Sequence, residues 1–298
     1  MNKILVPTDF SFLANCAMNF ATQLAKLESS CIKLLHVIEP PLYKMNSTGE
    51  IIKDPLGDVY VLELVAKSKK QLHDILETYC DRKITIEYEV VIGNPANSIL
   101  DEITSNGIDQ VIMGSRGASW LDRFLVGSTT EKVVRNAACP VITLKCNIER
   151  VEKLQRIVYA FDAHEDQSLI INELKKLSQP LGAHLYFLRV VTPAKFDTQR
   201  AVTKQLDDFV KEHNLKNYST HIYTDTSEEE GIMHFAEEVN ADLIAMGTDT
   251  HTNILQLLTT NLREDIVNHS QRPVWTYNSR LAKHVQSDES NENYTCQL

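Results

Sequence analysis

The stretch that decides the fold is MGSRGASWLDRFLVGSTT, residues 113–130. It follows the run DQVI at 109–112 and precedes a helical pattern at 131–138. A strand that loops through small residues into the start of a helix presents unpaired backbone N–H groups to an anion. We therefore expect an anion site between a β-strand and the helix that follows it. The residues that suggest it are Gly114, Gly117, Gly127 and Ser128–Thr130.

Outward from this stretch, strands alternate with helices through the first half of the chain. Short β-branched runs predict the strands, and apolar residues at three- and four-residue spacing predict the helices. Residues 42–58 show no steady period and predict a loop. Alternation of this kind favours a parallel sheet with helices on both faces. The expected strands are Lys3–Thr8, Ile32–Ile38, Ile84–Ile92, Asp109–Met113 and Val141–Leu144, and the expected helices are Ser11–Leu27, Val59–Tyr79, a short one ending at Ser105, and Glu131–Ala138.

The same pattern restarts in the second half of the chain. The run RIVYAFD at 156–162 aligns with KILVPTD at 3–9, at an offset of 153 residues. Further on, DLIAMG at 242–247 aligns with DQVIMG at 109–114, at an offset of 133. The offset falls by 20 residues because the second half lacks the loop near 41–60. Two related units explain this better than one continuous fold.

The repeat predicts the domain organisation. We expect two doubly wound, five-stranded parallel-sheet domains of Rossmann-like architecture in tandem. We assign them to residues 1–147 and 154–280. Residues 287–298 are polar and acidic, and we expect a disordered tail there.

Composition excludes several classes of function. Residues 1–150 carry 16 Lys and Arg against 18 Asp and Glu, and the remainder carries 14 against 22. Neither half has a basic stripe, which argues against nucleic acid and anionic membrane surfaces as main partners. No apolar run approaches the ~20 residues of a membrane helix. Pro7 and Asp9 interrupt the first apolar run too early for a signal peptide, so we expect a cytoplasmic protein.

The six cysteines and ten histidines show no metal or redox spacing. Neither C-x-x-C nor H-E-x-x-H occurs. We expect buried or incidental thiols in a reducing compartment. A structural or catalytic metal held by protein side chains alone is not expected.

Several motifs together resemble the universal stress protein family. They are Gly114-x2-Gly117-x9-Gly127-Ser128, the opening Val6–Ser11, the pair His36-Val37 and the entry to the fifth strand, Cys139–Val141. The resemblance covers nearly the whole chain as a tandem pair, apart from the 41–60 loop and the tail. It implies a fold like that of the adenine nucleotide alpha hydrolases. It also implies a stress-response regulator that binds ATP, or a related adenine nucleotide, with or without Mg²⁺.

The resemblance places the nucleotide in the first half. Asp9 would approach the ribose or a phosphate-bound Mg²⁺, and the backbone of Val37 would hydrogen-bond the adenine. Two loop glycines would let the backbone approach the phosphates, which the start of the following helix would bind. Arg116 is either an extra phosphate contact or a solvated loop arginine. The full set is Pro7, Thr8, Asp9, Val37, Met113, Gly114, Arg116, Gly117, Gly127, Ser128 and Thr129.

The second half departs from this pattern where phosphates would lie. Thr250 stands where Gly117 does, Thr260 where Gly127 does, and Asn261 where Ser128 does. Side chains at these positions would crowd a phosphate chain, and Asp249, in the place of Arg116, would repel it. Phe161 and Ala163 replace Thr8 and Phe10, although Asp162 persists. We expect the second half to keep the fold without binding ATP.

Other interpretations of these residues stay open. Residues 113–130 could be a plain connecting loop. Its apolar residues could form a short amphipathic helix or contact a partner; they are Trp120, Leu121, Phe124 and Leu125. Ser128–Thr130 could be helix caps. No G-x-S-x-G, no G-x-x-x-x-G-K-[ST] and no paired-carboxylate motif names a catalyst, although Mg²⁺ and Asp9 could position water for slow ATP hydrolysis. The rival functions are a regulator read by an unknown protein partner, a weak ATPase or nucleotide-transfer enzyme, and a scaffold that binds no nucleotide or another small ligand in the second half.

Two segments are expected to be edge strands, Val141–Lys145 and Val274–Asn278. An exposed strand edge invites pairing. In the family that the chain resembles, these last strands meet across a dimer contact. We therefore expect the two halves of one chain to pair with each other, and further association into a homodimer stays open.

Overall fold

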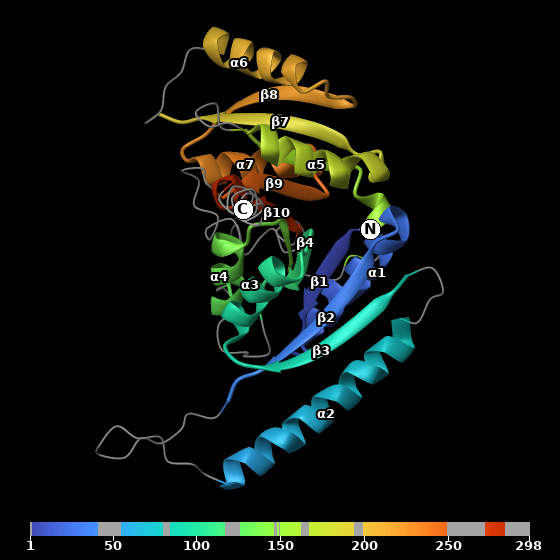
Figure 1. Ribbon diagram of the computed structural model, residues 1–298. Helices are drawn as coiled ribbons and strands as arrows, with labels where there is room; N and C mark the ends of the chain where they lie inside the picture. Colours follow the sequence, from blue (N-terminus) through green and yellow to red (C-terminus); the bar gives the residue numbers. More distant parts are fainter. Residues whose placement is uncertain are drawn as a thin grey trace, which may run out of the picture.

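The structure, a computed structural model, describes residues 2–40, 55–79, 84–116, 126–145, 148, 150–161, 167–193, 199–248 and 272–283. Within these residues the chain forms one sheet of ten strands with helices on both faces (Figure 1). The expected tail at 287–298 and residues 41–54 of the expected loop lie outside the described residues.

The first half contains five parallel strands, and each strand predicted there is present. Two helix starts were wrong: α2 begins at Pro55, inside the predicted loop, and α4 begins at Ser128, three residues before the predicted Glu131. Proline suits the first turn of a helix, because the N–H that it lacks has no partner there anyway. The elements are β1 (Lys3–Pro7), α1 (Phe12–Glu28), β2 (Cys31–Ile38), α2 (Pro55–Tyr79), β3 (Ile86–Ile92), α3 (Pro95–Ser105), β4 (Gln110–Gly114), α4 (Ser128–Asn136) and β5 (Val141–Leu144).

The second half repeats the order of elements from β1 to β4, and its last strand corresponds to β5; residues 249–271, between its last two strands, lie outside the described residues. Its helix α6 is much shorter than its counterpart α2, with 14 residues against 25. The elements are the 3-10 helix η1 (Val151–Lys153), β6 (Arg156–Ala160), α5 (Ser168–Leu181), β7 (His184–Val191), α6 (Gln199–Glu212), β8 (Tyr218–Thr224), α7 (Glu228–Glu238), β9 (Leu243–Gly247) and β10 (Val274–Tyr277). None of the described helices is long and apolar enough to cross a membrane.

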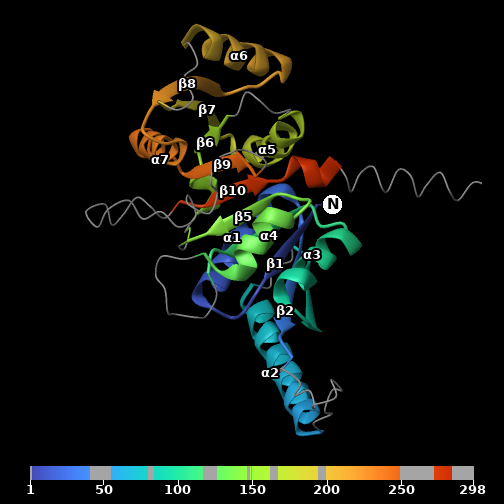
Figure 2. The same cartoon turned by 90° about the vertical axis from the view of Figure 1, so that its left-hand side faces the viewer.

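The strand order is β3-β2-β1-β4-β5-β10-β9-β6-β7-β8, so each half has the doubly wound order expected from the sequence. The halves meet where β5 and β10 pair antiparallel, with Trp275 opposite Ile142 (Figure 2). Two threonine hydroxyls reinforce the pair: Thr143 Oγ1 donates to the Val274 carbonyl at 3.3 Å, and Thr276 Oγ1 donates to the Val141 carbonyl at 3.2 Å. The predicted internal pairing is confirmed, and the edges of the joined sheet are β3 and β8.

Local signals account for where several helices begin and end. Ser11 caps α1 by accepting from the Ala14 N–H, and Asn94 caps α3 with Pro95 in its first turn. Ser227 caps α7 in the same way as Ser11 caps α1. Gly182 ends α5 at a left-handed φ of 62°, a conformation that glycine adopts without strain.

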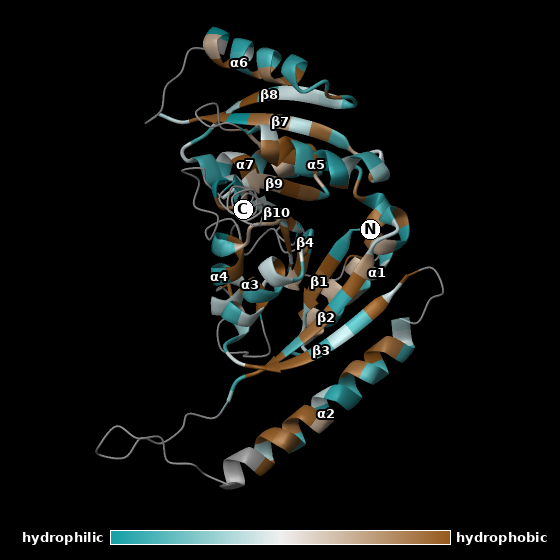
Figure 3. Ribbon diagram, in the orientation of Figure 1, coloured by the Kyte–Doolittle hydropathy of each residue, from teal (hydrophilic) through white to brown (hydrophobic). Residues whose placement is uncertain are grey.

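Helices cover both faces of the sheet, so its central strands are apolar on both sides (Figure 3). The buried residues of α1, α2, α5 and α6 pack on one face, and those of α3, α4 and α7 pack on the other. Every residue of β5, β9 and β10 is buried. Polar side chains that line a site must therefore come from the ends of the strands and from the loops that follow them.

Candidate functional site

A cavity of about 420 Å³ lies at the carboxyl ends of β1, β2 and β4, where the strand order reverses. In doubly wound sheets the loops on either side of this point leave toward opposite faces and open a crevice between them. The starts of α3 and α4 close the sides of this crevice. Its lining is formed by Pro7, Thr8, Asp9, Ala14, Leu35, Val37, Glu39, Pro95, Ile99, Met113, Gly114, Arg116, Gly127, Ser128, Thr129 and Thr130.

The loop after β1 is held in a tight conformation. The Thr8 N–H donates to the Leu35 carbonyl at 2.8 Å, and the Thr8 hydroxyl oxygen accepts from the Phe10 N–H at 3.1 Å. Phe10 has a left-handed φ of 62°, which costs a non-glycine residue free energy. Its ring packs 4.4 Å from that of His36, whose Nδ1 hydrogen-bonds to the Thr8 carbonyl. These contacts fix Asp9 at the cavity, where its Oδ1 accepts from the Ser11 N–H.

Gly114, the last residue of β4, is required for close packing. A Cβ at this position would lie 2.7 Å from the Leu13 Cβ and 3.2 Å from the Leu13 carbonyl carbon. The sequence predicts that this glycine brings the backbone close to a ligand, but the contact that demands it is with the first turn of α1. The Gly114 carbonyl also accepts from Thr130 Oγ1 at 3.0 Å, which ties β4 to the start of α4.

The first turn of α4 faces the cavity with its backbone donors. Gly127 is the N-cap and offers no side-chain cap, so Ser128, Thr129 and Thr130 are the first three helical residues and not caps. The N–H groups at the start of a helix have no partners within it and carry the positive end of the helix dipole. Because Thr130 donates to Gly114, the hydroxyls left for a ligand in this turn are those of Ser128 and Thr129.

Ten of the eleven residues singled out in the sequence line this one cavity. The eleventh, Gly117, lies outside the described residues, as do Trp120, Leu121, Phe124 and Leu125. Thr130, which the sequence assigned to the anion-binding helix start, lines the cavity as well. Sequence reasoning missed five lining residues: Ala14, Leu35, Glu39, Pro95 and Ile99. Glu39 follows β2 directly, and Pro95 and Ile99 lie one turn apart on α3. The position of these three residues after strand ends was a signal that could have found them.

At the corresponding place in the second half, two of the described counterparts carry larger side chains. Phe161, in the place of Thr8, is buried and packs its ring 4.9 Å from that of Phe209. Gln167, in the place of Ala14, is buried and bonded to the Tyr159 hydroxyl. Val190, in the place of Val37, is buried under α7. The other counterparts singled out in the sequence, Asp162, Ala163, Asp249, Thr250, Thr260 and Asn261, lie outside the described residues.

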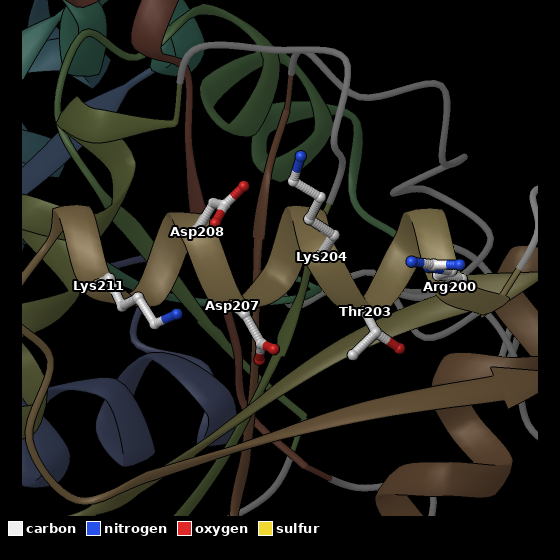
Figure 4. A pocket seen from close by; sticks show the side chains of 6 residues that line it. All are labelled: Arg200, Thr203, Lys204, Asp207, Asp208 and Lys211. Carbon is white, nitrogen blue, oxygen red and sulfur yellow. The ribbon is translucent and has the colours of Figure 1, made fainter.

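A separate hollow runs along the exposed side of α6 (Figure 4). Six residues of this one helix line it, at the three- and four-residue spacing of a single helix face: Arg200, Thr203, Lys204, Asp207, Asp208 and Lys211. Both positive and negative side chains line this hollow, as is usual for a solvated helix surface. In the part of the chain that the structure describes, no group of three or more His, Cys, Asp or Glu side chains is arranged to hold a metal ion.

Comparison with known proteins finds the same family in both halves of the chain. The model of the universal stress protein family matches residues 1–145 and again residues 153–278. Two curated relatives of single-domain length are the universal stress proteins YxiE of Bacillus subtilis, 28% identical over 148 residues, and MJ0577 of Methanocaldococcus jannaschii, 29% identical over 152 residues. Each alignment covers 48% of this chain, and 99% and 94% of the respective relatives.

Among solved structures, a universal stress protein from Archaeoglobus fulgidus superposes over 93% of this chain and 98% of its own, with a TM-score of 0.70 and 22% identity. At that level of identity the likeness concerns the fold, and it extends over both halves and the way they are joined.

Proposed function

The chain belongs to the universal stress protein family, and from this premise we propose that its first half binds ATP or a closely related adenine nucleotide. The observation that carries the proposal is the cavity at the carboxyl ends of β1, β2 and β4, where ten residues of the expected nucleotide set converge. Its volume of about 420 Å³ falls in the range of about 300–1,000 Å³ that is usual for small-ligand sites.

The phosphates belong at the start of α4. The N–H groups of residues 128–130, the Ser128 and Thr129 hydroxyls and the helix dipole all favour negative charge there. Arg116 lines the same end of the cavity and adds a positive charge. The structure favours the phosphate-contact interpretation of this arginine over a solvated one.

The adenine belongs between β2 and α3. Leu35, Val37, Pro95 and Ile99 give this end of the cavity an apolar lining that suits a flat aromatic base. Asp9 and Glu39 lie at the cavity too, and their carboxylate oxygens suit ribose hydroxyls or a nucleotide-bound Mg²⁺. The metal would neutralise phosphate charge, and the carboxylates would orient it.

We propose a regulatory role in the cytoplasm, in which the nucleotide-bound and nucleotide-free forms are distinguished by a protein partner. Among the lining residues that the structure describes there is no histidine or lysine, and Asp9 and Glu39 are the only ionisable acids. Turnover by a carboxylate alone would be slow. Comparison of hydrolysis by the wild type and Asp9→Ala tests this: loss of measurable turnover in the variant would show that Asp9 is catalytic and would favour an enzyme.

The binding proposal is tested by titrating the whole chain with Mg²⁺–ATP in a calorimeter. We expect one site per chain, because the larger Phe161 and Gln167 stand in the places of Thr8 and Ala14, and the second half lacks the later glycines of the phosphate loop. Ser128→Glu sets a carboxylate against the phosphates and is expected to weaken binding by about 100-fold or more, roughly 3 kcal/mol of lost attraction and added repulsion.

Asn97→Glu is the matched control for this variant. It adds the same charge to the first turn of the neighbouring helix α3, at an exposed position outside the cavity lining, and should leave binding within a few-fold of the wild type. No binding by the wild type would overturn the proposal. Two sites per chain would overturn its restriction to the first half.

A further inference from the structure

Two histidine rings of the second half converge on one hydroxyl group. His184 at the start of β7 and His221 on β8 each place Nε2 against Ser219 Oγ, at 2.9 and 2.8 Å. Since β7 and β8 run parallel and side chains alternate along a strand, all three side chains project from the same face of the sheet. The cluster lies at the amino ends of these strands, far along the sheet from the cavity of the first half.

The hydrogen bonds around the cluster define how the His184 ring is held. Asn217 donates from Nδ2 to the Gly182 carbonyl, which leaves Asn217 Oδ1 as the acceptor at 2.9 Å from His184 Nδ1. His184 therefore carries its proton on Nδ1, and its Nε2 lone pair points at Ser219. Metal-binding histidines are oriented in the same way by an oxygen that accepts from the second ring nitrogen.

Aromatic side chains hold the two rings in place. The Tyr186 ring lies 4.6 Å from that of His184, and the Phe235 ring lies 4.9 Å from that of His221. Coordination uses the neutral form of each imidazole, whose free nitrogen lone pair binds the metal.

We propose that His184 and His221 form a site for one divalent late transition metal ion, with Ser219 Oγ as a third donor and water in the remaining positions. Two imidazole nitrogens at about 2.0–2.1 Å from the ion, an oxygen and water satisfy Zn²⁺ or Cu²⁺. Small rotations of the rings bring both Nε2 atoms from their shared hydrogen-bond partner to such an ion. Because Ser219 donates its one proton to His184, His221 donates from Nε2 in the metal-free protein, and this proton must leave for Nδ1 of the same ring or for water when the ion binds. Binding Cu²⁺ more tightly than Zn²⁺ is expected from the general order of metal affinities.

The site belongs to the second half alone. The corresponding positions of the first half hold Cys31 on β2 and Glu87 and Glu89 on β3, so no imidazole pair faces the helix there. The inference is also independent of nucleotide binding, because it concerns a different half and the opposite ends of the strands.

The experiment uses the full chain without an oligohistidine tag, freed of metals with a chelator that is then removed. Zn²⁺ is titrated by calorimetry, and Cu²⁺ is added for electron paramagnetic resonance. We expect one Zn²⁺ per chain and a Cu²⁺ spectrum with coupling to two imidazole nitrogens. His184→Ala and His221→Ala should each lower affinity by about tenfold or more, since even outer partners of metal ligands are worth about 10- to 100-fold.

Two further variants separate coordination from folding. Asn217→Gly removes the acceptor that orients His184 but suits the left-handed φ of 57° at this position, so weaker binding without loss of fold is expected. Ser219→Cys should bind Zn²⁺ more tightly, because a thiolate is a stronger ligand than a hydroxyl. This gain cannot arise from a damaged fold.

His73→Ala is the matched control, because His73 is exposed on α2 and pairs with Glu77 at 3.4 Å, a possible adventitious site. It should leave the affinity unchanged. Absence of stoichiometric Zn²⁺ binding, or equal affinity in the wild type, His221→Ala and Ser219→Cys, would overturn the proposal. Loss of binding in His73→Ala alone would assign the metal to the exposed helix and would overturn it too.

Discussion

The two halves of the sheet have the same strand order but differ in the side chains at the carboxyl ends of their strands. In the first half the carboxyl ends of the strands surround a cavity, with Ala14 and Thr8 on its wall. In the second half the same positions carry Gln167 and Phe161, both buried in contacts with neighbouring side chains. The strand order thus specifies where a site can form, and we expect a few side chains at the strand ends to determine whether one forms.

A second contrast lies on the face covered by α3 and α7. In the first half Lys33 Nζ lies 2.7 Å from Glu89 and 2.6 Å from Glu102. Burial would lower the pKa of Lys33, but hydrogen bonds to these two carboxylates outweigh it and raise the pKa. The corresponding residues of the second half are Tyr186, His221 and Phe235, which pack ring against ring. Ionic and aromatic triads thus fill equivalent space between sheet and helix.

The largest effect is expected when the aromatic triad is broken. Phe235→Ala should lower the free energy of unfolding by about 3–5 kcal/mol, because the ring is buried against three aromatic neighbours and leaves a cavity. Urea unfolding followed by circular dichroism measures it. The counterpart Glu102→Ala should cost less, about 1–3 kcal/mol, since Lys33 keeps its bond to Glu89. Equal losses would contradict the distinction between the two triads.

An intermediate effect is expected where α7 approaches β7 more closely than α3 approaches β2. A Cβ on Gly231 would lie 2.5 Å from Val190 Cγ1 and 3.1 Å from the Asp225 Cβ. Its counterpart in the first half is Ser98, whose side chain is accommodated. Gly231→Ser should therefore destabilise the protein by about 1–3 kcal/mol through overpacking, although replacing a helical glycine normally stabilises.

Ser98→Gly is the matched exchange and should cost about 0.5 kcal/mol, from the difference in helix propensity alone. Thermal unfolding of both variants provides the comparison. A more stable Gly231→Ser variant would show that Val190 moves aside freely and that the two helices do not differ in how closely they pack.

The smallest effect is expected in the dependence of the free energy of unfolding on pH. Burial raises the pKa of Glu28, at the end of α1, to about 7 against 4.5 for an exposed carboxyl, and a hydrogen bond from Ser30 opposes the shift. The folded state thus binds the proton of the Glu28 carboxyl more tightly than the unfolded state does. Ionisation of the buried carboxyl destabilises the fold, and this loss of stability is absent below about pH 4.5 and complete above about pH 7. Glu28→Gln should raise the free energy of unfolding at pH 8 by ~1 kcal/mol, a value discounted for partial solvation, and leave it unchanged at pH 4.

Titration of His221 in the second half should change the stability in the opposite direction with pH. Its pKa is lowered in the folded state, so stability should fall as pH drops below about 6.5, where the unfolded chain takes up the proton first. Unfolding in urea from pH 4 to pH 8, with a chelator present, checks both residues. A pH dependence that is identical for the wild type and Glu28→Gln would contradict the assignment.

Much of this arrangement follows from local patterns in the sequence. The alternation of strands and helices predicts a doubly wound sheet, and the repeat predicts that it occurs twice. The resemblance to the universal stress protein family predicted that Val141–Lys145 and Val274–Asn278 would pair, and the strands within these segments do. The same resemblance assigned Asp9 and Ser128 to one nucleotide site, and both line the cavity.

Other features depend on contacts between distant segments and could not be predicted. The need for glycine at 114 comes from Leu13, about a hundred residues earlier. The convergence of His184 with Ser219 and His221 depends on the register of β7 and β8, which no local pattern specifies. The start of α2 at Pro55 was missed because its first turn has no apolar period.

The antiparallel pair of β5 and β10 has a further consequence for how such a protein changes over generations. Two identical chains joined by this edge would carry every substitution twice, once on each side of a two-fold axis. With both copies in one polypeptide, a mutation enters a single copy, so one half is free to lose a ligand site while the other retains it. The covalent link also fixes the effective concentration of the partner strand, and the pairing no longer depends on how much protein the cell makes.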